Sequence, residues 1–278
     1  MASGNYPCHV RALARLILIM VGVFDSGIGG LTVVSEILHR FPDAELTYIG
    51  DTARIPWGNK HPETIIHYSV QLTKFLLNKG AQTIVIACHT ASSVALEAVR
   101  KTAPNTPIFE MITQSSQDAV AKSKNKKIGI IGTKTTINSS SWDKAIKKID
   151  KSIVTFSQAC PLFVPLVEEG LENHPATKLF IKDYLLPLQE KGIDSLVLAC
   201  THYPFLAKPM KEFLGDKIAL INPGQSVARV LPQIPSGKIE LNFTDTPSSQ
   251  SPFLKLLETR PDATINTIGL EIIENDTV

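Results

Sequence analysis

The stretch TIVIACHTAS, residues 83–92, decides the fold because SLVLACTHYP, residues 195–204, repeats its pattern. Each stretch has four apolar residues, then Ala-Cys, then a His and a Thr in one order or the other. A short apolar run that stops abruptly is typical of a strand buried in a parallel sheet. The repeat therefore predicts two related α/β lobes, each with a cysteine, Cys88 or Cys200, where a strand ends.

Around these two stretches, strand-like apolar runs alternate with amphipathic segments of helical length. The predicted strands are residues 19–24, 45–51, 83–88, 126–133, 152–160 and 195–200. The predicted helices are residues 29–41, 61–80, 91–102, 139–149, 175–192 with a break at Pro187, and 205–214 as a helix or a pair of turns. This alternation predicts an α/β fold of mainly parallel sheets with helices on both faces.

The C-terminal segment is rich in Pro, Ser and Thr and differs from the rest of the chain. It contains a predicted strand at residues 239–244, a helix at 253–260 and a final strand at 264–273. This segment is too short for a core of its own, so we expect it to pack on one of the two sheets. The expected division is a first lobe of residues 21–112 plus 224–278 and a second, pseudo-symmetric lobe of residues 113–223. Since ligands bind at the carboxyl ends of parallel strands, the active site is expected in the cleft between the lobes.

Residues 1–20 are expected to form a poorly ordered N-terminal extension. Residues 11–24 contain two arginines and then an apolar run, as a signal peptide does. The run is too short to span a membrane and leads directly into the first strand, so we expect a soluble, cytoplasmic protein without a membrane partner. Met20, just before that strand, is a candidate start.

Composition and charge exclude several classes of protein. The formal net charge is +2, and the densest basic run, residues 122–127, is interpreted as a solvated turn, so no nucleic acid partner is expected. The four cysteines lack a CxxC spacing, which argues against a structural zinc site and against a disulfide framework. Free thiols suit the reducing cytoplasm. Cys8 and Cys160 have no paired context and are expected to be structural.

Two thiols at strand ends suit a reaction that inverts a carbon centre by moving a proton. One acid/base group removes the proton from one face, and a second group of the same kind delivers a proton to the other face. Cys88 and Cys200 both precede a predicted helix, whose N-terminus would lower the thiol pKa from about 8.5. Asp25 or His202 would hold the proton next to a thiol. Three hydroxyl-bearing residues near the strand ends would fix a carboxylate: Ser26, Thr90 and Thr201.

Five motifs together resemble the glutamate racemase family, part of the wider aspartate/glutamate racemase superfamily. In chain order they are VGVFDSGIGGLTV, IGDTARIPWG, VIACHTAS, CPLFVPLVEEG and LACTHYP, and the similarity covers about residues 21–221. The resemblance implies racemisation of glutamate without pyridoxal phosphate, metal or other cofactor, supplying D-glutamate for bacterial peptidoglycan. It also allows a homodimer, although the sequence does not fix the oligomeric state.

The resemblance also implies a role for individual residues. Cys88 would deprotonate D-glutamate with Asp25 nearby, and Cys200 would deprotonate L-glutamate. His202 and Glu168 would assist Cys200 in proton transfer. The implied substrate-binding residues are Asp25, Ser26, Trp57, Gly58, His89, Thr90, Thr201 and His202, with Thr136 as a further candidate.

Three positions in these motifs depart from the family pattern. His89 stands where the family usually has Asn, Trp57 where it has Tyr, and Ala199 where it has Gly. As a cation, the His89 imidazole would lower the pKa of Cys88, and its bulk could instead crowd the site. Two alternatives to glutamate racemisation therefore stay open. One is a racemase for aspartate or another acidic amino acid, and the other is a catalytically lapsed binding homologue.

Overall fold

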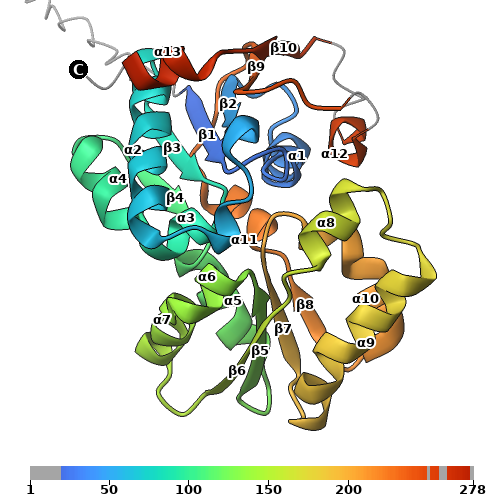
Figure 1. Cartoon of the computed structure of the whole chain (residues 1–278). Coiled ribbons are helices and arrows are strands. Elements are labelled where there is room, and N and C mark those ends of the chain that lie inside the picture. Colours follow the sequence, from blue (N-terminus) through green and yellow to red (C-terminus); the bar gives the residue numbers. More distant parts are fainter. Residues whose placement is uncertain (1–19, 249–250, 257–261, 276–278) are drawn as a thin grey trace, which may run out of the picture.

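The computed structural model describes residues 20–248, 251–256 and 262–275. Its strands form two parallel sheets, flanked by helices and stacked one above the other in Figure 1. The extension expected at residues 1–20, apart from Met20, lies outside the described residues, as does Cys8. Two parallel sheets flanked by helices confirm the predicted α/β class.

The first sheet combines the N-terminal part of the chain with the C-terminal segment. Its strand order is β10-β9-β2-β1-β3-β4, and all of its neighbouring strands are parallel. The strands are β1 (Val21–Asp25), β2 (Leu46–Gly50), β3 (Thr83–Ile86), β4 (Ile108–Glu110), β9 (Ile239–Phe243) and β10 (Thr264–Thr267). Because β9 pairs with β2, the C-terminal segment packs on the first sheet, as predicted.

The second sheet repeats the arrangement of the first. Its order is β6-β5-β7-β8, which matches β2-β1-β3-β4 position by position. The strands are β5 (Lys127–Gly132), β6 (Val154–Ala159), β7 (Ser195–Ala199) and β8 (Ala219–Ile221), again all parallel. The strands before Cys88 and Cys200, β3 and β7, therefore occupy equivalent places. Both are fully buried, which explains their continuous apolar sequence.

Helices connect the strands and cover both sheets (Figure 1). The larger ones are α1 (Leu31–Arg40), α2 (Pro62–Asn78), α5 (Thr113–Lys122), α7 (Ser141–Ile149), α9 (Pro175–Glu190), α10 (Ala207–Leu214) and α11 (Pro223–Val230). The shorter ones are η1 (Thr52–Arg54), η2 (Trp57–Asn59), α3 (His89–Val94), α4 (Leu96–Thr102), α6 (Lys134–Asn138), α8 (Phe163–Glu168), η3 (Tyr203–Leu206), α12 (Pro252–Lys255) and α13 (Leu270–Asn275). No helix in the described ranges is long and apolar enough to cross a membrane.

Several predicted elements differ from the structure. The helix predicted at residues 91–102 is divided at Ala95 into α3 and α4. The break predicted at Pro187 is wrong, because α9 continues to Glu190. A proline so near the helix end removes one backbone donor and disturbs only the last turn. The strand predicted at residues 264–273 is β10 followed by α13. The three-residue strands β4 and β8 were too short to predict from periodicity.

Candidate active site

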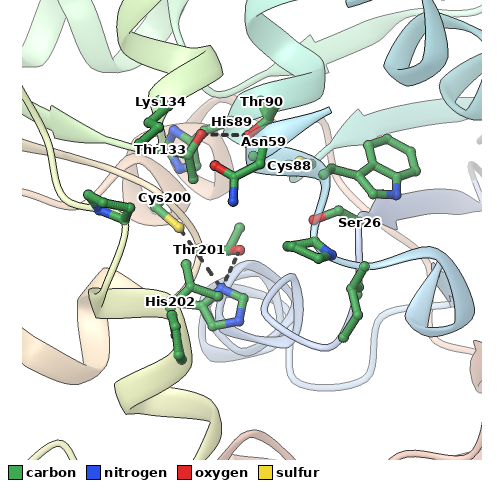
Figure 2. Close-up of a pocket in the computed structure, with 18 of the residues that line it drawn as sticks. Ser26, Asn59, Cys88, His89, Thr90, Thr133, Lys134, Cys200, Thr201 and His202 are labelled. Atoms are coloured by element: carbon green, nitrogen blue, oxygen red, sulfur yellow. Dashed lines mark hydrogen bonds between the residues drawn. The ribbon is translucent and has the colours of Figure 1, made fainter. Parts of the chain in front are cut away.

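The carboxyl ends of the two sheets face a common cavity of about 170 Å³. Figure 2 shows Cys88 and Cys200 on opposite sides of this cavity. Its lining residues come from both sequence repeats and the loops near them: Ser26, Gly27, Ile55, Pro56, Trp57, Gly58, Asn59, Cys88, His89, Thr90, Thr133, Lys134, Pro161, Val164, Pro165, Glu168, Cys200, Thr201 and His202. Among the sequence-predicted site residues, Asp25 and Thr136 do not line it.

Asp25, the last residue of β1, lies behind the cavity wall and is fully buried. Its Oδ2 accepts hydrogen bonds from the backbone N–H groups of Gly27 (3.1 Å) and Gly30 (3.0 Å). Its Oδ1 has no hydrogen-bond partner in the described part of the chain. Burial raises the pKa of Asp25 to about 6, although His202 and the backbone donors favour the ionised form. A carboxyl group with this pKa exchanges protons readily near neutral pH.

Cys88 caps the N-terminus of α3, and its Sγ accepts from Ala91 N at 3.5 Å. Burial, together with the negative charge of Asp25, raises the pKa of Cys88 to about 11. The predicted lowering of this pKa is therefore wrong. Hydrogen bonds from Ser26 and Ala91 do favour the thiolate, but they do not offset the removal of the thiol from water.

His89, the first residue of α3, is buried and stacks on Trp142, with ring centroids 5.9 Å apart and an interplanar angle of 20°. Burial lowers the pKa of His89 to about 3, so the imidazole is neutral near pH 7. The proposal that His89 acts as a cation beside Cys88 is therefore wrong. Its Nδ1 finds no hydrogen-bond partner among the described residues.

Cys200 follows β7 and belongs to a chain of three side chains. Its Sγ lies 3.9 Å from His202 Nδ1, and His202 Nε2 lies 3.1 Å from Glu168 Oε1 on α8. Burial raises the pKa of Cys200 well above its usual range, so the lowering predicted for Cys200 is wrong as well. The contact between His202 and Glu168, predicted from the resemblance alone, thus has a direct geometric basis. This arrangement can move a proton between the thiol and the imidazole while the carboxylate orients the ring.

Three threonine hydroxyls join the two repeats beside the cavity. Thr90 Oγ1 lies 3.0 Å from Thr133 Oγ1 and 3.3 Å from Thr136 Oγ1. Thr136 is buried behind the other two, so it supports the cavity wall. The sequence analysis missed Thr133, Lys134 and Asn59 as lining residues. Thr133 directly follows β5, and its position at a strand end was the available signal.

Trp57 and Gly58 belong to a loop, residues 55–59, that lines one side of the cavity. Trp57 Nε1 donates to Asp51 Oδ2 at 3.2 Å, and Asp51 is fully buried. Asp51 also accepts from Arg54 Nε and from Thr244 Oγ1. From the second repeat, Thr135 Oγ1 donates to Gly58 O at 2.9 Å. The loop is therefore fixed by a hydrogen bond to Asp51, which Arg54 and Thr244 hold in place, and by one from Thr135 of the second lobe.

Replacing Trp57 with phenylalanine is expected to lower the free energy of unfolding by about 1.5–3 kcal/mol. The variant keeps a ring against Tyr68, whose ring centroid lies 5.6 Å from that of Trp57, but loses the hydrogen bond to the Asp51 carboxylate. Chemical denaturation of both proteins measures the difference. Equal stability would show that this hydrogen bond does not hold the loop.

The described residues contain no group of three or more His, Cys, Asp or Glu side chains placed to hold a metal ion. Besides His89 and Lys134, the titratable groups in and directly behind the cavity wall form two sets. One set is Cys88 with Asp25, and the other is Cys200 with His202 and Glu168. Each set can release or accept a proton at one side of a bound molecule.

Comparison with known proteins identifies the family of the chain. Residues 31–231 match the family model described as Asp/Glu/Hydantoin racemase. The curated glutamate racemase of Geobacter metallireducens is 42% identical over 217 residues, which are 78% of this chain and 80% of that protein. The chain belongs to the glutamate racemase family.

Solved structures of this family share the fold of the chain. A glutamate racemase isoform from Bacillus anthracis superposes with a TM-score of 0.83 at 32% identity, covering 91% of this chain and 98% of that one. The glutamate racemase of Francisella tularensis, solved in complex with D-glutamate, gives a TM-score of 0.82 at 30% identity, covering 92% and 99%. The two-sheet architecture is therefore the glutamate racemase fold.

Proposed function

We propose that this chain, an amino-acid racemase by its family, interconverts L-glutamate and D-glutamate with Cys88 and Cys200 as its two acid/base groups. The observation that supports the proposal most directly is that both thiols line one cavity from equivalent strands of the two sheets. A substrate bound between them has one thiol on each face of its α-carbon. One thiol removes the α-proton as a thiolate, and the other delivers a proton to the opposite face.

Each thiol needs a partner, because burial keeps both thiols protonated near pH 7. For Cys88 the partner is Asp25, which is largely ionised at pH 7 with a pKa of about 6. For Cys200 the partner is His202, oriented by Glu168. We assign Cys88 to D-glutamate and Cys200 to L-glutamate, following the family resemblance.

The substrate carboxylates need hydrogen-bond donors, and the cavity wall offers several. Hydroxyl groups of Ser26, Thr90 and Thr201 and the loop at Trp57 and Gly58 line the cavity. A related enzyme was solved with D-glutamate bound, which supports glutamate as the substrate here. His89 and His202 complete the proposed substrate-binding set.

The family also suggests the setting in which the chain acts. We propose a cytoplasmic enzyme that supplies D-glutamate for peptidoglycan and assembles as a homodimer. Its lobes are proposed as residues 21–112 plus 224–278 and residues 113–223. The strands of the first sheet fall in the first set of residues, and those of the second sheet fall in the second.

The decisive experiment incubates the protein with each glutamate enantiomer in deuterated water. Racemisation predicts loss of optical rotation together with deuterium incorporation at Cα, starting from either enantiomer. A protein that binds glutamate without exchange would instead be a lapsed homologue. A panel of acidic amino acids tests the remaining alternative, since faster turnover of aspartate would reassign the substrate.

Replacing His89 with asparagine is expected to leave the shape of the pH–rate profile unchanged between about pH 6 and pH 9. With a pKa of about 3, His89 is neutral throughout that range and contributes no ionisation. The measurement is kcat/KM as a function of pH for both proteins. A shifted acid limb would show that His89 titrates in this range, and a large gain in turnover would support a lapsed parent enzyme.

A further inference from the structure

We propose that Phe253, on helix α12 of the C-terminal segment, is a positioning residue that holds the His202 imidazole in line with Cys200. The inference rests on the proposed function, since it concerns the step in which Cys200 exchanges a proton with L-glutamate. None of the five motifs of the resemblance contains Phe253. The C-terminal segment thus contributes directly to the surroundings of the reacting groups.

The contact is between two buried rings. The ring of Phe253 meets that of His202 in an edge-to-face arrangement, with centroids 5.0 Å apart and an interplanar angle of 71°. Phe253 is fully buried, and His202 is 5% exposed. Phe205 supports Phe253 from another side, with its ring centroid at 4.6 Å. Edge-to-face pairs at these separations are a favoured aromatic geometry.

The remaining sides of the imidazole are also in contact. Nδ1 faces Cys200 Sγ at 3.9 Å and Thr201 Oγ1 at 3.4 Å, and Nε2 faces Glu168 Oε1 at 3.1 Å. Gly29 lies so close that a Cβ atom there would be 2.5 Å from His202 Cε1. The two nitrogens of the ring have their polar partners, and Phe253 supplies the apolar packing that limits its other movements.

The packing of Phe253 on His202 affects proton transfer at Cys200 more than proton transfer at Cys88. Without the Phe253 ring, His202 gains room to tilt away from the line between Cys200 and Glu168. Proton transfer through Cys200 then slows. Phe253 belongs with Cys200 to one cluster of packed buried side chains, whereas Cys88 belongs to a different cluster, so proton transfer at Cys88 keeps its geometry.

The test replaces Phe253 with leucine and measures kcat/KM and primary isotope effects with α-deuterated L-glutamate and α-deuterated D-glutamate. We expect kcat/KM to fall roughly tenfold, because small displacements of reacting groups are costly. An equilibrium constant of one forces the same loss of kcat/KM for both enantiomers, so this loss alone does not identify the affected thiol. The isotope effects do identify it. The effect should rise for L-glutamate, whose C–H bond breaks at Cys200, and fall for D-glutamate.

The control is Phe75→Leu, at a buried ring in the last turn of α2 that does not line the cavity. This variant should lose stability while both isotope effects stay unchanged. Isotope effects are ratios, so they do not depend on the folded fraction of a variant, and Phe253→Met repeats the test with a side chain of similar size. The inference would be overturned if the isotope effects of the Phe253 variants were unchanged or if both changed in the same direction. It would also be overturned if the effect fell for L-glutamate and rose for D-glutamate. Absence of racemisation by the parent protein would instead overturn the proposed function.

Discussion

Replacing either Cys88 or Cys200 with alanine is expected to reduce racemisation by at least about 1,000-fold. Each variant removes the thiol that the described residues place on one face of the cavity, so a proton can no longer be removed from one face and delivered to the other. The surviving thiol still acts on its own enantiomer. Cys200→Ala should therefore exchange the α-hydrogen of D-glutamate with solvent without inverting it, and Cys88→Ala should do the same with L-glutamate.

Cys160→Ala is the matched control for both variants. Cys160 is as deeply buried as the other two thiols but does not line the cavity. The hydroxyl of Tyr203 donates to the backbone oxygen of Cys160 at 2.9 Å, and alanine keeps this contact. Polarimetry measures inversion, and proton NMR in deuterated water measures exchange. Racemisation that survives in Cys88→Ala or Cys200→Ala, or that is lost in Cys160→Ala, would refute the two-thiol mechanism.

The sequence predicted the two cysteine-bearing strand ends correctly, because the apolar pattern of a buried strand and a residue suited to acid/base chemistry occur there side by side. β3 and β7 are short, continuous apolar strands, and each is followed closely by a cysteine; Cys88 also caps the N-terminus of α3. Burial on both faces of a parallel sheet makes such a pattern readable from local sequence. The equivalent order of the two sheets then follows from the repeat itself, and so does the common cavity at the strand ends.

The features that were missed or wrong depend on contacts between distant residues. The raised pKa of Cys88 comes mainly from its burial, in a cluster of side chains that includes Trp57 and Ile273. The neutral state of His89 comes from the same cause, in a site where its ring stacks on Trp142. Phe253 reaches His202 only because β9 carries the C-terminal segment to the edge of β2. Local patterns do not encode which side chains exclude water from a given group.

Replacing Asp25 with asparagine is expected to lower kcat/KM by roughly 100-fold while making the protein more stable at pH 7. Activity falls because the amide cannot accept the proton of Cys88. Stability rises because the parent protein keeps a carboxylate in a fully buried site, where its pKa is about 6. The asparagine oxygen can still accept from Gly27 N and Gly30 N, as Asp25 Oδ2 does.

The size and pH dependence of this stabilisation follow from the pKa of Asp25. The folded protein has a pKa of about 6 there, whereas the ordinary value is 3.8, so ionising Asp25 costs the folded state roughly 3 kcal/mol at pH 7. Between these two values the folded state holds a proton that the unfolded chain has released. The stability contributed by Asp25 is therefore complete below about pH 4 and is lost as the pH rises to about 6.

Asparagine has no such ionisation, so the difference in unfolding free energy between the variant and the parent should grow from pH 4 to pH 6 and then level off. Part of this stabilisation is lost in the variant. The asparagine N–H₂ group takes the place of Asp25 Oδ1, which has no hydrogen-bond partner among the described residues. Burying a donor without a partner costs about 1 kcal/mol or more. Denaturant unfolding at a series of pH values measures the difference directly. If the difference in unfolding free energy did not depend on pH, Asp25 would ionise normally in the folded protein. Asp25 would then lack the raised pKa on which its role as proton acceptor beside Cys88 rests.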